Sequence, residues 1–241
     1  MDIRSSGRRC VMKKQILLIP AYNPKIFLIG FIQQLLEKPF LQIIVVNDGS
    51  DESSTSIFEQ LQQLERVTVL THARNEGKGI AVKTGIAYIL KTYQQFQGIV
   101  TVGADGQHEI EDVELICNST RIFGNSFIVG VRDFKTKNMP RLRYVTYQIA
   151  SLLFDIYYKK RLTDVQSGIR YLPREHLNWL VNSKGKGYEY DAEILIEAIN
   201  RGIQIYEVPI GKAKMTQNEF LQYDGVYHPM MVMKRFWKKK G

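Results

Sequence analysis

The stretch GADGQH, Gly103–His108, carries three polar side chains directly after the apolar run GIVTV. That run is typical of a buried strand, so Asp105, Gln107 and His108 fall where the strand should end. One carboxylate and two neutral ligands suffice for a Mg²⁺ or Mn²⁺ ion that also binds a nucleotide diphosphate, because phosphate oxygens and water complete its shell. A glycine, Gly103, stands where an Asp would make an acidic pair with Asp105. The stretch predicts either a cation site with a single protein carboxylate or a simple turn.

Two further segments carry groups suited to a nucleotide. Asp48 and Asp51 in NDGSD follow another apolar run, and a carboxylate there can accept hydrogen bonds from a base or a ribose, whereas it would repel phosphates. The segment NEGKG (75–79) supplies two glycines and Lys78 before a predicted helix, so backbone N–H groups and a cation can face an anion. It is not a Walker A loop, which has a longer glycine spacing followed by Ser or Thr.

The elements that must position these residues follow from hydrophobic patterning. Short apolar runs alternate with longer amphipathic stretches, which indicates βαβ units and an α/β fold with a mostly parallel sheet buried on both faces. The predicted strands are 15–20, 41–47, 66–71, 98–103 and 126–131, and the predicted helices are 25–36, 52–64, 79–92 and 111–123. Ligands bind beyond the carboxyl ends of such strands. We therefore expect PAYNP, NDGSD, ARNEGKG and GADGQH to converge on one edge and form the site.

The pattern changes beyond residue 132. Apolar residues recur at helical spacing over 142–158, with Lys and Arg on both flanks; this segment can lie on a membrane surface or serve as a core helix, and both interpretations stay open. The segment DVQSGIRYL (164–172), a helix at 189–200 and a strand at 203–209 follow. Carboxylates alternate in YEYDAE at the start of that helix, where they can act as a general base or simply favour the helix dipole: Glu189, Asp191 and Glu193.

Composition limits the class of protein. The chain has 241 residues, 44% hydrophobic residues and a net charge of +9, which is typical of one soluble globular domain that favours anionic partners. No uninterrupted apolar run reaches the roughly 18 residues that a membrane-spanning helix needs. Two cysteines without metal-ligand spacing indicate a reducing, cytoplasmic compartment.

The ordered set of motifs over residues 15–211 resembles family 2 glycosyltransferases of the GT-A fold. The matching segments are IPAYN, VVNDGSDESS, NEGKGIAVKTGI, GADGQH, VGVR, DVQSGIRYLPREHL and GYEYDAEILIEAINRGIQIYEVPI. The resemblance is to the group of dolichyl-phosphate mannosyltransferase and bacterial polyprenyl-phosphate glycosyltransferases. It implies a Rossmann-like, mostly parallel sheet with helices on both faces, and an inverting transfer of sugar from a UDP- or GDP-sugar, assisted by Mg²⁺ or Mn²⁺. The implied acceptor is a polyprenyl- or dolichyl-type lipid phosphate.

The sequence also predicts a domain plan, and the resemblance implies roles for most of the candidate site residues. Residues 1–14 are expected to be a disordered basic leader, 15–215 a single domain (a nucleotide-sugar half, 15–131, and an acceptor half, 132–215), and 216–241 a basic aromatic tail. The implied nucleotide-sugar set is Pro20, Ala21, Tyr22, Asn23, Asp48, Lys78 and Asp105. The implied acceptor set is Arg132, Gln166, Ser167 and Arg170. The implied metal ligands are Asp105 and Gln107, with Gly103 in place of the family's first Asp. The expected catalytic residues are Asp105, Arg132, Arg170 and Asp191.

The expected chemistry depends on the acceptor. A diphosphate leaving group develops negative charge, which Arg132, Arg170 and a metal ion can stabilise. A lipid phosphate is already ionised, its second pKa being about 6, whereas a sugar hydroxyl of a cell-surface glycan or glycolipid would need a general base. A nucleotide-sugar-binding protein without turnover is a further alternative, and nucleic-acid binding is not expected. Peripheral contact with the cytoplasmic face of the membrane is expected through 142–158 and the tail KRFWKKK (234–240).

Overall fold

The computed structural model describes residues 14–133, 151–152, 155–156, 158, 162–165 and 167–212. Nearly all of the predicted leader, the predicted tail, most of the 142–158 segment and Gln166 lie outside the described residues, so the predictions for them stay predictions. Among the described residues, no helix is long and apolar enough to cross a membrane.

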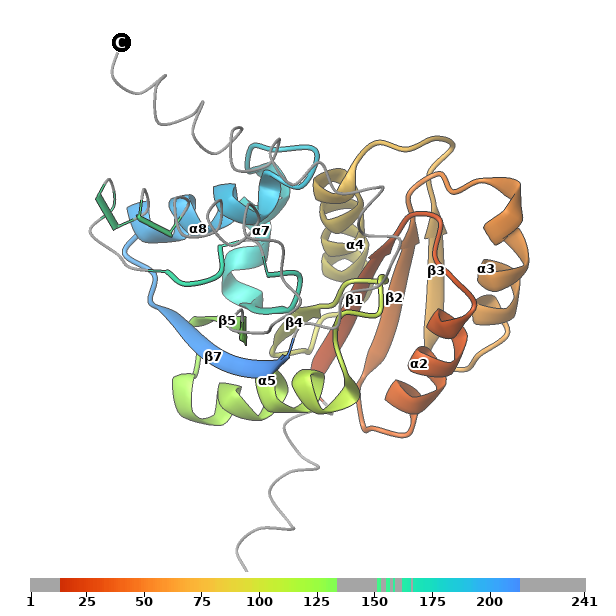
Figure 1. Cartoon of the computed structure of the whole chain (residues 1–241), viewed down its shortest axis with the longest axis horizontal. Coiled ribbons are helices and arrows are strands. Elements are labelled where there is room, and N and C mark those ends of the chain that lie inside the picture. Colours follow the sequence, from red (N-terminus) through yellow and green to blue (C-terminus); the bar gives the residue numbers. More distant parts are fainter. Residues whose placement is uncertain are drawn as a thin grey trace, which may run out of the picture.

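One seven-stranded sheet runs through the described chain, in the order β3-β2-β1-β4-β6-β5-β7 (Figure 1). The strands are β1 (Gln15–Ala21), β2 (Gln42–Asn47), β3 (Val67–Thr71), β4 (Gly98–Thr101), β5 (Phe127–Asp133), β6 (Arg170–Pro173) and β7 (Ile205–Lys212). Neighbouring strands are parallel except at β6, which runs antiparallel to both β4 and β5. The predicted mostly parallel sheet is confirmed.

Side-chain alternation along the strands divides the core into two layers. In β1, Ile16 and Leu18 belong to one buried cluster, and Leu17 and Ile19 belong to the other, because successive side chains of a strand point to opposite faces. The first layer packs against α4 (Lys78–Thr92), α7 (Leu177–Asn182) and α8 (Tyr190–Asn200), and the second against α2 (Phe27–Leu36), α3 (Thr55–Gln62) and α5 (Ile110–Phe123). The predicted helices on both faces are therefore confirmed (Figure 1).

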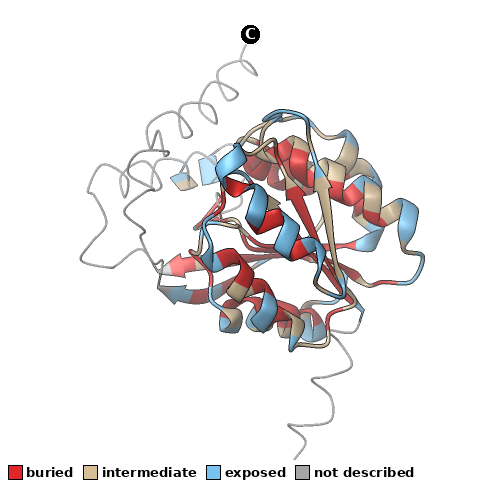
Figure 2. Ribbon diagram, turned by 90° about the vertical axis from the view of Figure 1, so that its right-hand side faces the viewer, coloured by how far each residue is buried: buried red, intermediate tan, exposed pale blue. Residues whose placement is uncertain are grey.

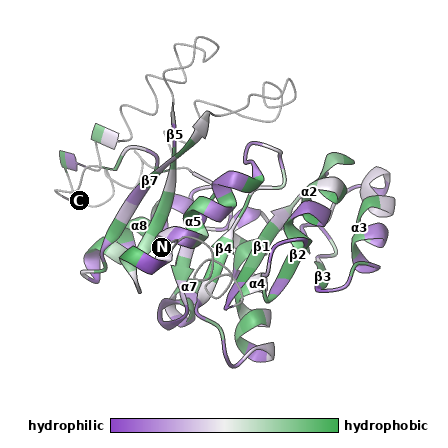
Figure 3. Ribbon diagram, turned by 90° about the horizontal axis from the view of Figure 1, so that it is seen from below, coloured by the Kyte–Doolittle hydropathy of each residue, from purple (hydrophilic) through white to green (hydrophobic). Residues whose placement is uncertain are grey.

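The colouring of the structure follows this layering. Figure 2 shows buried strands at the centre and helices whose outer sides are exposed. Figure 3 shows hydrophobic central strands beside helices, such as α3, that carry hydrophilic residues. Two short 3₁₀ turns, η1 (Glu52–Ser54) and η2 (Arg174–His176), lead into α3 and α7.

Sequence patterning did not predict β6. The strand has only four residues and carries a charged residue, Arg170, at its start, so it lacks the apolar alternation that identifies strands. Its pairing with β4 places Arg170 opposite Thr101, and the Thr101 hydroxyl donates to the Gly168 carbonyl at 3.2 Å. This antiparallel strand therefore brings the 162–168 segment to the carboxyl end of β4.

We predict that Gly85→Ala destabilises the fold by about 1–3 kcal/mol through overpacking. A Cβ at Gly85 in α4 would lie 2.2 Å from Cδ1 of Leu18, which is fully buried in β1, so the helix must move from the sheet. Urea unfolding measures the change. The matched control is Gly30→Ala in α2, where a Cβ meets nothing within 4 Å; it should be neutral or stabilise by up to about 1 kcal/mol. Equal effects of the two substitutions would contradict the prediction.

Candidate active site

The polar segments after β1, β2, β3 and β4 meet at the carboxyl edge of the sheet, as predicted. Asn23, after β1, forms a reciprocal pair with Asp51, after β2: the Asn23 amide donates to the Asp51 carboxylate at 2.8 Å, and the Asp51 N–H donates to the Asn23 amide oxygen at 2.8 Å. The Asn23 N–H also donates to the Ser50 hydroxyl at 2.9 Å. These bonds fix the first two segments against each other.

Asp48 ties the second segment to the third. Its carboxylate is buried and accepts hydrogen bonds from the N–H groups of Glu76 (3.0 Å) and Gly77 (2.9 Å). The ring Nδ1 of His72 lies 2.7 Å from the same carboxylate, and its Nε2 lies 3.0 Å from the Thr84 hydroxyl. The predicted contact of Asp48 with a nucleotide base stays a prediction; in the described structure Asp48 anchors the NEGKG segment.

This arrangement corrects one expectation about NEGKG. Its backbone N–H groups do face an anion, but that anion is the chain's own Asp48 carboxylate. The glycines serve close packing instead: Gly77 has φ +101°, and a Cβ there would lie 2.6 Å from the Lys186 carbonyl oxygen. A Cβ at Gly79 would lie 2.7 Å from that of Tyr190. The Lys78 side chain of this segment is 18% exposed.

Lys78 pairs with Asp191 across the site. Its ammonium donates to the Asp191 carboxylate, and the side chains are 18% and 10% exposed. Arg170 lies behind this pair, with its guanidinium 3.7 Å from the second Asp191 oxygen. Arg170 is fully buried and donates to the backbone carbonyls of Ser167 (2.9 Å), Val165 (2.8 Å) and Asp191. Arg170 thus holds the 162–168 segment against the start of α8.

Arg132 occupies a second buried ion pair. Its guanidinium donates to both carboxylate oxygens of Asp164, at 2.7 and 3.0 Å, and to the side-chain oxygen of Gln107 at 2.8 Å. The side chains of Arg132 and Asp164 are 4% and 0% exposed. A bidentate contact of this kind is strong and directional. The oxygen through which Gln107 was expected to bind a metal therefore already accepts a hydrogen bond from Arg132.

The GADGQH stretch forms a turn, and this turn carries an exposed carboxylate. The Gln107 N–H donates to the Asp105 carboxylate at 3.1 Å, and Gly106 has φ +77°. Asp105 itself is exposed. A Cβ at Gly103 would lie 3.0 Å from an Asp105 carboxylate oxygen, so a side chain at Gly103 would point at that carboxylate. The missing Asp of the pattern would thus complete the expected acidic pair.

Three hydrogen-bonding atoms surround the space at Gly168. A Cβ at Gly168 would lie 3.6 Å from Nε2 of His108, 3.8 Å from the backbone nitrogen of Gly103 and 4.0 Å from Nζ of Lys78. Gly168 is partly exposed. An imidazole nitrogen, a backbone nitrogen and an ammonium group from three separate segments can therefore contact one ligand group there, such as a phosphate oxygen.

His108 is a buried residue at this point. It is 5% exposed, and among the described residues its Nδ1 has no hydrogen-bond partner. Burial lowers the pKa of His108 to about 4, although Asp105 raises it; Arg132 lowers it further. The imidazole is therefore neutral at physiological pH.

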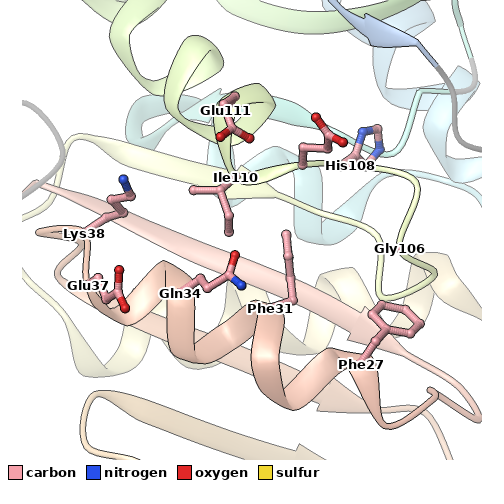
Figure 4. Close-up of a pocket in the computed structure, with 10 residues that line it drawn as sticks. Phe27, Phe31, Gln34, Glu37, Lys38, Gly106, His108, Ile110 and Glu111 are labelled. Atoms are coloured by element: carbon pink, nitrogen blue, oxygen red, sulfur yellow. The ribbon is translucent and has the colours of Figure 1, made fainter.

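A pocket of about 540 Å³ lies beside the GADGQH turn, between α2 and the start of α5 (Figure 4). Phe27, Phe31 and Ile110 form its apolar part, and glutamates stand around it. The Phe27 ring packs on Gly106, 3.0 Å from where a Cβ would lie. His108 lines this pocket, and its Nε2 also borders the space at Gly168. Its ring therefore lies between the pocket and the Lys78–Asp191 ion pair.

The residues present can bind a divalent cation only if a second ligand, such as a diphosphate, helps to coordinate it. The described part of the chain contains no group of three or more His, Cys, Asp and Glu side chains that could hold a metal ion. Asp105 is the exposed carboxylate of the GADGQH turn, and Gln107 is engaged by Arg132. Because Mg²⁺ needs only one or two carboxylates when phosphates and water complete its shell, a diphosphate would supply the rest.

The other predicted site residues divide into exposed and buried ones. Pro20, Ala21 and Tyr22 lie at the carboxyl end of β1, with Tyr22 44% exposed. Ser167 is fully buried, so in this structure it is reached by a substrate only if the 162–168 segment moves. Sequence reasoning missed His72 and Asp164. His72 follows a predicted strand and Asp164 begins the DVQSGIRYL segment, but neither position indicates which side chain the residue will contact.

The chain matches the family model described as "Glycosyl transferase family 2" over residues 16–177. It is 30% identical to the UDP-N-acetylglucosamine–dolichyl-phosphate N-acetylglucosaminyltransferase of Methanococcus voltae, covering 80% of this chain and 83% of that protein. It is 26% identical to the polyprenol monophosphomannose synthase of Mycolicibacterium smegmatis, and the match covers 82% of this chain and 77% of that protein.

Solved structures show the same fold. Glucosyl-3-phosphoglycerate synthase from Mycobacterium tuberculosis, in complex with Mn²⁺, UDP-glucose and phosphoglyceric acid, has a TM-score of 0.68 at 16% identity, covering 92% of this chain and 79% of that one. The predicted GT-A-type fold is confirmed by this likeness.

We predict that His108 makes the metal-free protein less stable as the pH falls from about 6.5 toward 4. Its folded pKa of about 4 lies below the ordinary 6.5, so the unfolded chain binds a proton that the folded one does not. The stability is complete above pH 6.5, and about 3 kcal/mol is lost by pH 4. Urea unfolding at several pH values should give a shallower pH dependence for His108→Asn.

The matched control is His176→Gln, since the His176 side chain is 19% exposed and should contribute less. A His108→Asn profile parallel to that of the wild type would contradict the prediction.

Proposed function

Because the chain belongs to glycosyl transferase family 2 and is a glycosyltransferase, we propose that it transfers a sugar from a nucleotide-diphosphate sugar to a polyprenyl-type lipid phosphate. The observation that carries the proposal is the convergence of Lys78, the Gly103 backbone nitrogen and His108 on the space at Gly168, beside the exposed Asp105. A cation, a backbone group and a carboxylate that can share a metal ion suit a diphosphate.

The proposed transfer inverts the configuration at the anomeric carbon. The bond from that carbon to the diphosphate oxygen breaks, and its electron pair stays on the diphosphate. An oxygen of the lipid phosphate forms the new bond from the opposite side. Since that oxygen is already ionised near neutral pH, no side chain has to remove a proton. The protein has to neutralise the leaving group and align the two substrates.

Lys78 is the proposed cation for the leaving diphosphate. Its ammonium is 18% exposed and is held by Asp191, so it is oriented before the donor binds. A divalent cation at Asp105 would act as a Lewis acid toward the diphosphate. Gln107 is proposed to contribute to that site indirectly, through its hydrogen bond to Arg132.

Arg132 and Arg170 are proposed to position the site in this state of the protein. The Nε and Nη2 groups of Arg132 donate to the two carboxylate oxygens of Asp164, and Arg170 donates to three backbone carbonyls. Direct contact of either guanidinium with the diphosphate, and of Ser167 with the acceptor phosphate, requires movement of the segment that carries Asp164 and Ser167. The expected contact of Gln166, which lies outside the described residues, stays a prediction. The expected acceptor-binding residues remain part of the proposal if this segment moves when substrate binds.

A lipid phosphate is proposed as the acceptor because two relatives are named for dolichyl phosphate and polyprenol. The described residues of the 142–158 segment agree with contact at a membrane surface. Leu152 and Ile156 are helical, four residues apart, and 57% and 53% exposed, so they share one helix face. We propose peripheral attachment at the cytoplasmic face of the membrane.

Transfer to a sugar hydroxyl is the second candidate, with Asp191 as the general base. Its carboxylate accepts from Lys78 and lies 3.7 Å from Arg170. Taking up a proton would weaken both contacts, so the geometry favours the lipid phosphate.

We predict that UDP or GDP, with its sugar conjugate, stabilises the protein, and that Gly168→Ala weakens this binding at least about tenfold. A ligand at about 100 times its Kd adds about 2.7 kcal/mol, which a thermal-shift panel with and without Mn²⁺ detects. The new methyl group would occupy the space between His108, Gly103 and Lys78 without a clash, because its nearest neighbour lies at 3.6 Å.

Gly30→Ala is the control and should bind normally. Transfer to a short polyprenyl phosphate, followed by mass spectrometry, then tests the reaction. Binding unaffected by Gly168→Ala would show that the ligand lies elsewhere, and donor hydrolysis without transfer would refute the lipid-phosphate acceptor.

We further predict that Gly103→Asp tightens Mn²⁺ binding to the nucleotide-free protein, whereas Asp105→Ala removes the metal dependence of nucleotide binding. The new carboxylate would stand beside Asp105, since the Cβ position is 3.0 Å from its oxygen, and two carboxylates bind a cation better than one. Titration followed by Mn²⁺ electron paramagnetic resonance measures both effects. Unchanged Mn²⁺ affinity in Gly103→Asp would place the cation away from this turn.

A further inference from the structure

Tyr188 is an exposed aromatic residue at the edge of the candidate site. It is 47% exposed, whereas Tyr190, two residues later, is 1% exposed and donates its hydroxyl to the Leu180 carbonyl at 3.0 Å. Single exposed aromatic residues are common on proteins, so exposure alone carries no conclusion. The surroundings of Tyr188 distinguish it.

The segment that carries Tyr188 is held in place on both sides. One carboxylate oxygen of Glu189 accepts the N–H groups of Lys186 (2.9 Å) and Gly187 (3.0 Å). The Lys83 ammonium donates to the carbonyls of Ser183 and Gly185. The Ile80 N–H of α4 donates to the Lys186 carbonyl at 3.0 Å. A ring on so constrained a backbone loses little further freedom when a ligand binds it.

The ring stands next to the proposed diphosphate position. The Lys78 ammonium lies 5.5 Å from the centre of the Tyr188 ring and 4.0 Å from the space at Gly168. A sugar joined directly to a diphosphate that binds there extends only one ring width beyond it. The aromatic ring therefore lies within reach of a sugar joined to that diphosphate.

We infer that Tyr188 is a specificity-determining residue that packs against the pyranose ring of the donor sugar. The inference rests on the proposed function and adds to it the contact that distinguishes a nucleotide sugar from the bare nucleotide. The C–H groups of a pyranose face are apolar and slightly positive, and the face of an aromatic ring is negative. The phenol ring supplies this contact and the hydroxyl group does not, so Phe can replace Tyr.

The test compares the affinities of UDP and GDP with those of UDP-glucose and GDP-mannose, by calorimetry, for the wild type, Tyr188→Phe and Tyr188→Ala. In Tyr188→Ala, the sugar conjugate of the nucleotide that binds should weaken by about tenfold, which corresponds to about 1.4 kcal/mol, while the bare nucleotide changes by less than twofold. Tyr188→Phe should retain wild-type affinity for both. KM should rise more than kcat falls.

The matched control is Tyr206→Ala, because Tyr206 in β7 is 37% exposed and stacks on Phe123 at 4.2 Å, with no contact to Lys78 among those described. Equal weakening of the nucleotide and its conjugate in Tyr188→Ala would overturn the inference, since the ring would then contact the nucleoside. No change in either ligand would also overturn it. A wild-type protein that binds none of the four ligands would instead refute the proposed function, and this inference with it.

Discussion

The buried carboxylate of Asp48 is the constraint on which the rest of the site depends. It lies directly after β2, accepts two backbone N–H groups of the NEGKG segment and contacts the His72 ring. A buried carboxylate is costly unless hydrogen bonds satisfy it, and here the partners come from the segment that carries Lys78. The backbone beside Lys78 is therefore positioned by an interaction that involves no substrate.

Two buried guanidinium groups in the second half of the chain are likewise satisfied by partners within the protein. Arg132 is paired with Asp164, whereas Arg170 donates to backbone carbonyls and lies 3.7 Å from the Asp191 carboxylate. Removing one partner of such a pair leaves an uncompensated buried charge and typically costs about 3–5 kcal/mol. These contacts hold the 162–168 segment over the end of β4, so the antiparallel strand β6, rather than the parallel strands, completes the site.

Two of the accessible charges described at the site are opposite in sign. Lys78 is 18% exposed, and Asp105 is exposed on its turn. With Gly103 in place of a second carboxylate, this edge carries less negative charge toward a diphosphate than an acidic pair would. For the proposed cation site at Asp105, we expect weaker metal binding in the absence of nucleotide, because the diphosphate would supply ligands that the protein does not. The proposed metal and donor sites are then coupled through shared oxygens.

Sequence patterning predicted the α/β class, the positions along the chain of the strands up to β5, and the edge at which the polar segments meet. Alternating apolar runs and turn residues are local features, and the carboxyl ends of parallel strands share an edge whatever the details. The sequence also indicated candidate site residues, namely Asp48, Lys78, Asp105, Arg132, Arg170 and Asp191. The contacts that each of them makes could be seen only in the folded structure. Lys78 and Asp191 are 113 residues apart, and Arg132 and Asp164 are 32 apart, so no local pattern predicts these pairs. Burial and pairing depend on distant partners, and they determine which charges are left for a substrate.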